Sequence, residues 1–169
     1  MPPNIQALSA TLTRETAAVL MTLLDATPAD RFAWSPLEQG RTIQHQLAEC
    51  CLANRKWTTI LRTRSYANFP EEEAEAEFKR AADTAYLKAR LQETTTELAE
   101  AILSVPDEDL DKKIETAWGP YSLARCCMHA CWNMMYHEGQ INYVQTLYGD
   151  KDEHDPDWDA LAEAAESGI

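Results

Sequence analysis

Helical periodicity in four long stretches constrains the fold of this chain more than any other feature of its sequence. Apolar residues recur every three or four positions within about residues 4–25, 42–64, 71–104 and 122–148. The chain has only five Gly among its 169 residues, which argues against a fold rich in tight turns. Four helices of this length predict an all-α protein, a four-helix bundle.

The residues between these stretches predict how the helices begin, end and connect. Thr42 and Ser122 are good N-cap residues, and Gly149 is a good stop signal after the last helix. We expect residues 105–120 to form a long connection, and connections of this length allow crossovers between helices that are not neighbours. The sequence therefore predicts one bundle domain over residues 1–149.

The chain carries a formal net charge of −13, and much of this charge is local. Residues 150–169 hold eight acids and one Lys, and a second acidic run covers residues 71–77. We interpret these charges as solubilising and as favourable at helix starts. The excess of negative charge argues against nucleic acid or an anionic membrane as a partner. We expect residues 150–169 to form an acidic C-terminal tail with one short helix at about residues 158–166.

The cysteines are expected to be reduced thiols. No signal-like segment is recognisable at the start of the sequence and no apolar run is long enough to span a membrane, so we expect a cytoplasmic protein. Adjacent cysteines within helical stretches do not match the ligand spacing of zinc sites. We interpret them as small core side chains, with a reactive thiol near a pocket as the alternative. The five cysteines are Cys50, Cys51, Cys126, Cys127 and Cys131.

Two polar residues face inward on the fourth predicted helix. Asn133 and His137 lie one turn apart on the stripe that elsewhere carries apolar residues. Burying such groups without partners costs about 1–3 kcal/mol each. We therefore expect them to bind a metal, a water or a substrate, and the alternative is that they form hydrogen bonds between helices. The other members of the stripe are Cys126, Ala130, Ile141, Val144 and Tyr148.

The remaining histidines occupy other positions. His129 precedes His137 by two turns, so helical drift rotates it toward the flank of the stripe. On the second helix, His45 and Glu49 form an i, i+4 pair nearly opposite the apolar face, and periodicity alone predicts an exposed pair. His154 lies in the acidic tail and is expected at the surface.

Two elements of the sequence resemble the DinB superfamily. One is Thr42-Ile-Gln-His-Gln-Leu-Ala-Glu49, and the other is His137-Glu-Gly139-Gln140-Ile141. The segments Trp34-Ser-Pro36 and Thr116-Ala-Trp118-Gly119-Pro120 also resemble loops of the superfamily, so the resemblance extends from the first helix to Gly149. The superfamily includes bacillithiol S-transferases and the N-terminal domain of mycothiol-dependent maleylpyruvate isomerase. The resemblance implies a DinB-like four-helix bundle.

The resemblance also implies a metal site. Related proteins typically bind a metal through three His, one on the second helix and two on the fourth. Matching the motifs residue by residue places Glu49, Asn133 and His137 at these positions. Glu and His are ordinary ligands of divalent metals, whereas Asn is a weak one. We expect this set to hold a divalent metal, zinc or nickel, less tightly than three His and to favour metals that prefer oxygen.

Three further residues are candidates for substrate binding near this site: Gln140, His45 and His129. Gln140 follows His137 by one turn, and it can orient a ligand or the imidazole itself. Gly139 is explained most simply by close packing of helices, because it has no side chain.

The function implied by the resemblance is metal-dependent chemistry on a small molecule, through transfer of a low-molecular-weight thiol, hydrolysis or isomerisation. A metal would lower the pKa of a bound water or thiol and so generate a nucleophile near neutral pH. The alternative is a non-catalytic, small-ligand-binding or stress-associated bundle whose polar trio is a structural hydrogen-bond network. Because related bundles often pair and the first helix is apolar on more than one side, we also expect a homodimer.

Overall fold

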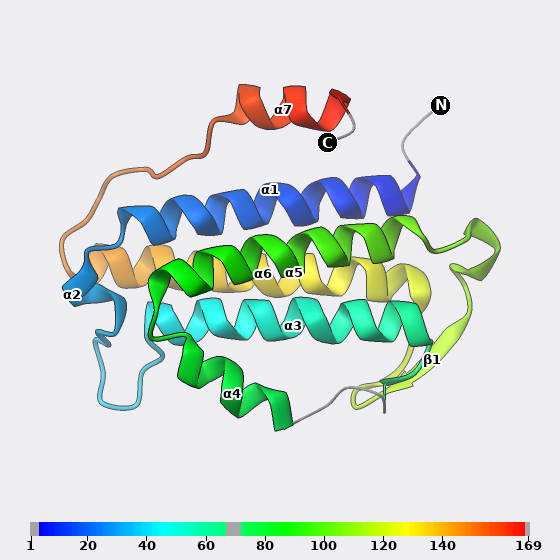
Figure 1. Ribbon diagram of the computed structural model, residues 1–169, viewed down its shortest axis with the longest axis horizontal. Coiled ribbons are helices and arrows are strands. Elements are labelled where there is room, and N and C mark those ends of the chain that lie inside the picture. The colour runs from blue at the N-terminus through cyan, green and yellow to red at the C-terminus, as the bar shows by residue number, and fades with distance from the viewer. Residues whose placement is uncertain (1–3, 67–71, 168–169) are drawn as a thin grey trace.

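The four predicted helices form in the computed structural model, which describes residues 4–66 and 72–167 (Figure 1). They pack side by side along the long axis of the molecule, which confirms the predicted all-α bundle. Their bounds are Ile5–Ala26 for α1, Ile43–Thr63 for α3, Thr84–Leu103 for α5 and Leu123–Leu147 for α6.

The helix ends follow the predicted capping chemistry. The Thr42 hydroxyl accepts a hydrogen bond from the His45 backbone N–H at 3.0 Å, and α3 begins at the next residue. Ser122 likewise caps α6 by accepting from the Arg125 N–H at 3.2 Å. Gly149 follows α6 with φ +100°, a left-handed conformation that suits a residue without a side chain.

The third predicted helix is two helices in the structure. α4 (Glu72–Arg80) ends, and α5 begins at Thr84 after a short break. The Asp83 carboxylate accepts hydrogen bonds from the backbone N–H groups of Ala85 at 2.9 Å and Tyr86 at 3.2 Å. Asp at an N-cap satisfies donors that a continuous helix would pair internally, so it starts a new helix here. The prediction of one helix to Ser104 is therefore wrong, and its predicted start after Pro70 lies outside the described residues.

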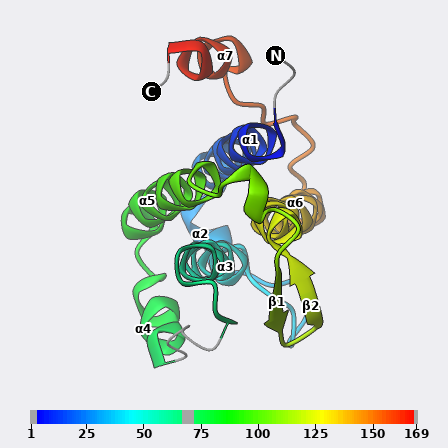
Figure 2. The same ribbon diagram turned by 90° about the vertical axis from the view of Figure 1, so that its right-hand side faces the viewer.

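The order of the helices around the bundle differs from their order along the chain. α1 and α3 each pack against both α5 and α6, so α1 lies diagonally across from α3 (Figure 2). The colour gradient in Figure 1 shows that α1 and α6 run in one direction and that α3 and α5 run in the other. α4 lies outside the four packed helices and carries the chain back along the bundle before α5 begins (Figures 1 and 2). The connections from α1 to α3 and from α5 to α6 join helices that are not neighbours, and they are the long crossover connections that the sequence predicted.

The connection before α6 contains a β-hairpin, which the sequence analysis did not predict. β1 (Lys113–Thr116) pairs antiparallel with β2 (Gly119–Ser122), and a 3-10 helix (Asp107–Asp109) precedes them. Ile114 and Tyr121 are paired and buried, so the hairpin has one face against the bundle. It extends from one end of the bundle beside α3 and α6 (Figure 2). A short helix, α2 (Ala29–Phe32), lies in the connection between α1 and α3.

The interior has two apolar clusters, one toward each end of the bundle. Buried polar side chains from different helices meet between them, where the Asn54 amide donates to the Thr95 hydroxyl at 3.3 Å. All five cysteines are buried and unpaired, which places them as small core side chains. None of the helices in the described part of the chain is both long and apolar enough to cross a membrane.

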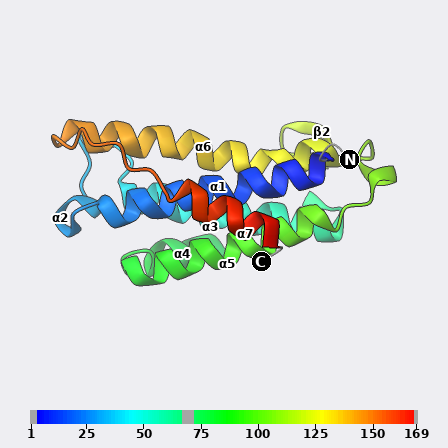
Figure 3. The same ribbon diagram turned by 90° about the horizontal axis from the view of Figure 1, so that it is seen from above.

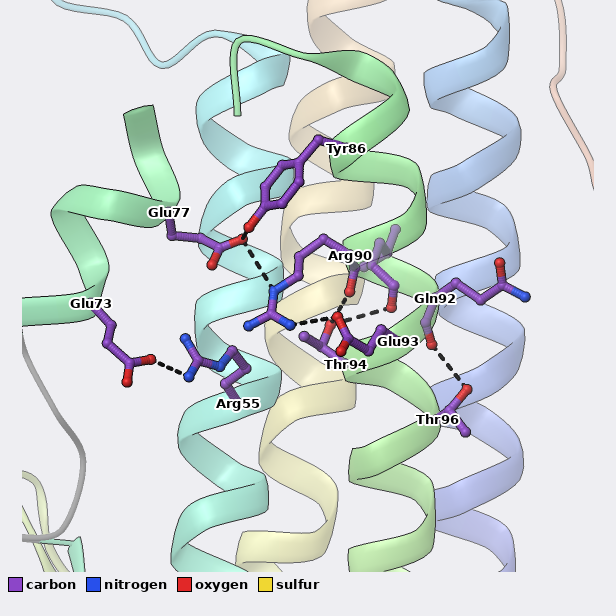
Figure 4. A network of polar contacts seen from close by, with 10 residues as sticks. Arg55, Glu73, Glu77, Tyr86, Arg90, Gln92, Glu93, Thr94 and Thr96 are labelled. Atoms are coloured by element: carbon purple, nitrogen blue, oxygen red, sulfur yellow. Dashed lines mark hydrogen bonds and ion pairs between the residues drawn. The ribbon is translucent and has the colours of Figure 1, made fainter. Parts of the chain in front are cut away.

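A buried carboxylate fastens α4 to the bundle (Figure 4). Glu77 of α4 is 3% exposed, accepts a hydrogen bond from the Tyr86 hydroxyl at 2.9 Å and pairs with Arg90 at 3.4 Å. Arg55 of α3 pairs with Glu73 of α4. These partners come from α3 and α5. α4 is therefore held against both helices, although the helical conformation is interrupted before Thr84.

The C-terminal segment lies on the outside of the bundle. α7 (Trp158–Ser167) forms close to the predicted range and lies above α1 (Figures 1 and 3). His154, expected at the surface, contacts the Asp150 carboxylate at 2.9 Å. The division into a domain of residues 1–149 and a tail of residues 150–169 stays a prediction.

Candidate functional site

Glu49 of α3 and His137 of α6 meet where these two neighbouring helices face each other. His137 is fully buried, and its Nε2 atom lies 3.5 Å from Oε1 of Glu49. That distance is at the outer limit of a hydrogen bond. The Glu49 side chain is 33% exposed, so it lies at the flank of α3 between core and solvent. The fully exposed position that periodicity suggested is therefore wrong for Glu49.

Gln140 contacts the other ring nitrogen of His137. Its Oε1 atom lies 2.9 Å from Nδ1 of His137. When that oxygen accepts from Nδ1–H and the ring is neutral, Nε2 keeps a lone pair. Nε2 is buried and has no hydrogen-bond partner among the described residues. In this tautomer the lone pair of Nε2 and the Glu49 carboxylate face each other with no donor between them.

Positive charge surrounds the carboxylate. The second oxygen of Glu49, Oε2, accepts from the Arg41 guanidinium at 2.5 Å. Contact with His137, aided by the Arg41 guanidinium, outweighs partial burial and holds the pKa of Glu49 below its ordinary value. Glu49 is therefore an anion at neutral pH, with one oxygen held by Arg41 and the other directed at His137.

Asn133 contributes a third polar atom from α6. The residue is half-buried, and its Oδ1 atom has no hydrogen-bond partner in the described part of the chain. Asn133 and Glu49 both line a cavity of about 340 Å³ between α3 and α6. The three residues predicted to form a metal site therefore lie at one place: His137 contacts Glu49, and Glu49 and Asn133 line the same cavity.

Four aromatic rings line this cavity. Trp57 and Trp118 stack with centroids 6.3 Å apart, and His129 lies 5.7 Å from Trp118 and 5.3 Å from Trp132. Helical periodicity predicts His129 on the flank of its helix and gives no sign that the three Trp residues line a site. Trp118 belongs to the hairpin turn, so only tertiary structure brings it to α3 and α6. The sequence signal for Trp118 was its place in the segment of residues 116–120, which resembles a loop of the DinB superfamily.

His129 and His45 have different surroundings. Burial, and then the charges of Arg125 and Lys56, lower the pKa of His129, so its ring is neutral at physiological pH. His45 lies one turn before Glu49, and its ring packs at 4.6 Å against Phe78. His45 lines a separate small cavity and does not line the one beside Glu49.

A second cavity lies on the other side of the His137–Glu49 contact. Its volume is about 610 Å³, and its polar lining comes from Arg41, Gln46 and Gln140. Gln140 therefore joins this second cavity to the imidazole, while Glu49 joins the aromatic cavity to it. The buried imidazole lies between two spaces that small molecules can enter.

The described residues contain no group of three or more His, Cys, Asp or Glu side chains placed to hold a metal ion. The predicted set supplies two such residues, Glu49 and His137, and the amide of Asn133. The cysteines offer no substitute, because burial raises the pKa of Cys51 to about 12 and those of Cys126 and Cys127 to about 11. Thiols with such pKa values stay protonated at neutral pH and are poor nucleophiles.

Comparison with solved structures identifies the fold. A crystal structure of a DinB-like protein from Bacillus subtilis matches with a TM-score of 0.66 and 11% identity, over 89% of this chain and 99% of that one. The crystal structure of a mycothiol-dependent maleylpyruvate isomerase matches with a TM-score of 0.65 and 14% identity, over 84% of this chain and 66% of that one. At these identities the likeness concerns the fold alone.

Comparison with curated proteins and with models of protein families addresses the family of the chain. No functionally curated protein matches the chain at a significant level. The model of the DinB family matches residues 3–159, which is most of the chain and extends past the bundle into the acidic tail. This protein therefore belongs to the DinB family.

Proposed function

We propose that this protein is a metal-dependent enzyme that transfers a low-molecular-weight thiol to a small molecule or hydrolyses one. The observation that carries the proposal is the unpartnered, buried Nε2 atom of His137, which faces Oε1 of Glu49 at 3.5 Å. Two groups that both offer lone pairs repel each other unless a cation lies between or beside them. A divalent metal bound by Glu49, Asn133 and His137 would remove that conflict.

The surrounding residues fit such an ion in two respects and oppose it in one. Imidazole nitrogen and carboxylate oxygen are ordinary ligands for zinc, and the amide oxygen of Asn133 is a weaker one. Metal-binding His residues usually donate their other ring N–H to a neighbouring acceptor, and Gln140 provides that acceptor for His137. Arg41 weakens the fit, because its positive charge on Glu49 Oε2 repels a cation bound at Oε1. The set therefore fits a weakly held ion.

The protein residues have separate roles in this proposal. A divalent ion held here would lower the pKa of a bound water or thiol. Gln140 holds the ring of His137 in the orientation and tautomer that direct Nε2 at Glu49. The Trp57, Trp118 and Trp132 rings would bind the apolar part of a substrate and exclude water from it. The Asn133 amide can also donate a hydrogen bond to a substrate through its nitrogen.

Support for a thiol as cosubstrate comes from a protein of similar fold, an isomerase that depends on mycothiol. Hydrolysis would use the same site with water in place of the thiol. The proposal places the protein in the cytoplasm, where low-molecular-weight thiols are kept reduced.

A structural role is the second candidate, and the ion pair between Arg41 and Glu49 favours it. If the Gln140 amide turned by 180°, its nitrogen would donate to Nδ1, and the proton of His137 would move to Nε2 and point at Glu49. Arg41, Glu49, His137 and Gln140 would then form a closed hydrogen-bond network that fixes the register of α3 against α6. The bundle would bind a small ligand without catalysis.

Calorimetric titration of chelator-treated protein with zinc, nickel and manganese separates the two candidates. The enzyme proposal expects saturable binding of at least one ion and loss of that binding in His137→Ala. The structural network expects no saturable binding, together with an equal loss of stability in His137→Ala with and without added metal. Wild-type protein that binds none of the three ions would overturn the metal proposal.

A further inference from the structure

A cavity of about 720 Å³ lies where the β-hairpin meets α1 and α6, and we refer to it as the hairpin cavity. Its volume is in the range of small-molecule sites. None of Glu49, Asn133 and His137 lines it, so the candidate site does not account for this space. Its aromatic and charged lining consists of Trp118, Tyr121, Arg125, His129 and Trp132.

Four rings form a continuous aromatic group beside the hairpin cavity. Trp118 and Tyr121 stack with centroids 6.3 Å apart and 25° between their planes. His129 lies 5.7 Å from Trp118 and 5.3 Å from Trp132. Trp118 is 57% exposed and Trp132 is 60% exposed, so much of the surface of both rings is open to a ligand. Large, rigid rings at a cavity favour a flat aromatic ligand that can stack on them.

Arg125 places a positive charge in this lining. Its Cζ atom lies over the Tyr121 ring, 3.6 Å from the ring centroid. This stacking uses the face of the guanidinium, whereas its N–H donors lie in its plane and stay available to an acceptor. None of the described acids forms an ion pair with Arg125. Because two N–H groups of a guanidinium match the two oxygens of a carboxylate, the edge of Arg125 fits that group.

The hairpin end of the cavity is positive although the chain as a whole carries −13. Lys56 Nζ lies 4.9 Å from the centroid of the Trp118 ring. Burial, and then the charges of Arg125 and Lys56, lower the pKa of His129, which lies among the same rings. Two cations therefore act on one aromatic group, and an anionic ligand is attracted to this end.

The other end of the cavity is negative. Cys131 also lines the cavity and lies about 9 Å further along α6 than Arg125, at the rise of each helical residue. Burial raises the pKa of the Cys131 thiol, and the charges of Glu15 and Glu138 raise it further. A negative group on a ligand is therefore repelled here and attracted at Arg125, which gives a bound anion one orientation.

The outer face of α6 around the cavity is open. Met128 is 42% exposed, and Gly139 lies two turns beyond Trp132 on the same face of the helix. A Cβ atom built at Gly139 meets no atom within 4 Å, so the close packing of helices that the sequence suggested for this glycine is wrong. A ligand can therefore enter from solvent, and a second copy of the chain packed on this face would compete with it for Trp132.

We propose that the hairpin cavity binds a planar aromatic carboxylate. The rings of this ligand stack on Trp118 and Trp132, and its carboxylate pairs with the edge of the Arg125 guanidinium. No residue of the predicted metal site takes part, so this site is independent of the metal proposal. Trp118, His129 and Trp132 also line the 340 Å³ cavity beside Glu49, so a ligand bound here contacts residues that form the wall of the candidate site.

The test is calorimetric titration of the chelator-treated full chain with naphthoate, which carries two fused rings and a carboxylate. Naphthamide, which has the same rings and no charge, is the matched ligand. Naphthoate is expected to bind saturably, and at least about tenfold more tightly than naphthamide. Because no metal is present, the carboxylate cannot bind an ion at Glu49, and the result does not depend on the outcome of the metal titration.

Arg125→Gln should weaken naphthoate binding by about tenfold and leave naphthamide binding unchanged, because it removes the charge and keeps the rings. Arg62→Gln is the matched control, since Arg62 is an exposed residue of α3 that pairs with Glu100 and does not line the hairpin cavity. It should keep the wild-type preference. Equal affinity of wild type for the two ligands, an unchanged preference in Arg125→Gln, or no binding of naphthoate would each overturn the proposal.

Trp132→Ala tests where the rings of the ligand lie. It should weaken both ligands to a similar degree, whereas Tyr143→Ala, an exposed aromatic residue of α6 outside the hairpin cavity, should weaken neither. Loss of naphthoate binding in Tyr143→Ala would place the ligand in the 610 Å³ cavity instead, because Tyr143 lines that cavity. A wild-type dimer that binds no naphthoate and dissociates in Trp132→Ala, measured by sedimentation, would assign the face to a second copy of the chain. Either result would overturn the proposal.

Discussion

Nε2 of His137 lies 3.5 Å from Oε1 of Glu49, and nothing in the described structure donates a hydrogen bond to that nitrogen. Gln140 holds the opposite ring nitrogen, and Arg41 holds the opposite carboxylate oxygen. The contact therefore lies within a chain of four side chains, and its central link contains two acceptors when Nδ1 carries the proton of a neutral His137 ring. A metal ion or a proton must complete that link, and the two possibilities respond differently to mutation and to pH.

Variants of the predicted metal site should change affinity in a definite order. Asn133→His adds an ordinary metal ligand and should tighten binding of zinc and nickel, while Glu49→Gln removes an anionic ligand and should weaken it. His45→Ala is the matched control, because His45 packs against Phe78 outside the cavity. The affinity of the His45→Ala variant for zinc and nickel should stay close to that of wild type. Equal effects of Glu49→Gln and His45→Ala in calorimetry would count against direct ligation by Glu49.

Gln140→Ala should weaken metal binding by about tenfold to a hundredfold, because it removes the acceptor that fixes the tautomer of His137. Gln140→Glu keeps an acceptor at the same place and should retain most of the affinity. If the four side chains form only a structural network, Gln140 affects the stability of the fold and nothing else. The free energy of unfolding of both variants is therefore measured as well, by chemical denaturation. A loss of stability in Gln140→Ala without a change in metal affinity would contradict the predicted orienting role.

The pKa of Glu49 predicts how stability depends on pH in metal-free protein. Its folded-state pKa lies below the ordinary value, so the ionised form is stabilised by folding. That contribution is fully present above the unfolded-state pKa of about 4.3 and is lost as the pH falls through the folded-state value. Glu49→Gln should therefore be less stable than wild type at neutral pH, and the difference should shrink in acid. Urea unfolding of both proteins across this pH range is the measurement, and a constant difference would contradict it.

The cysteines should be unreactive in the folded protein. All five are buried, and burial raises the pKa of each thiol, to about 11 for Cys126 and Cys127. Alkylation with iodoacetamide, followed by mass spectrometry, should be slow in buffer and rapid in urea. Cys131 should react first, because it lines an open cavity and is 4% exposed. Rapid modification of any cysteine in native protein would restore the alternative of a reactive thiol.

Truncation after Gly149 should leave the bundle folded. The tail is strongly acidic, α7 lies outside the four packed helices (Figure 3), and Trp158 is 48% exposed. Little apolar surface is therefore lost with the tail. A cooperative thermal transition close to that of the full chain is the expected result. Loss of cooperativity would show that the tail belongs to the domain, as the extent of the family match to residue 159 suggests.

The local sequence determined the helices, because the signals that form them act over a few residues. Thr42 and Ser122 cap α3 and α6 as predicted, and the apolar repeat of each helix identifies its buried side. The same local logic failed at Asp83, whose capping hydrogen bonds outweighed a continuous apolar pattern. It also failed for β1 and β2, whose four-residue strands carry too little periodicity to be recognised.

The candidate site was predicted only in part. Periodicity identified His137 as an inward-facing polar residue, because its position on α6 is a local property. Glu49 came from the family resemblance, since its position at the flank of α3 depends on how α3 and α6 pack. Trp118 reaches the cavity from the hairpin, and Arg41 reaches Glu49 from the loop before α3. Tertiary structure alone decided these contacts, because each joins segments whose relative position no local pattern specifies.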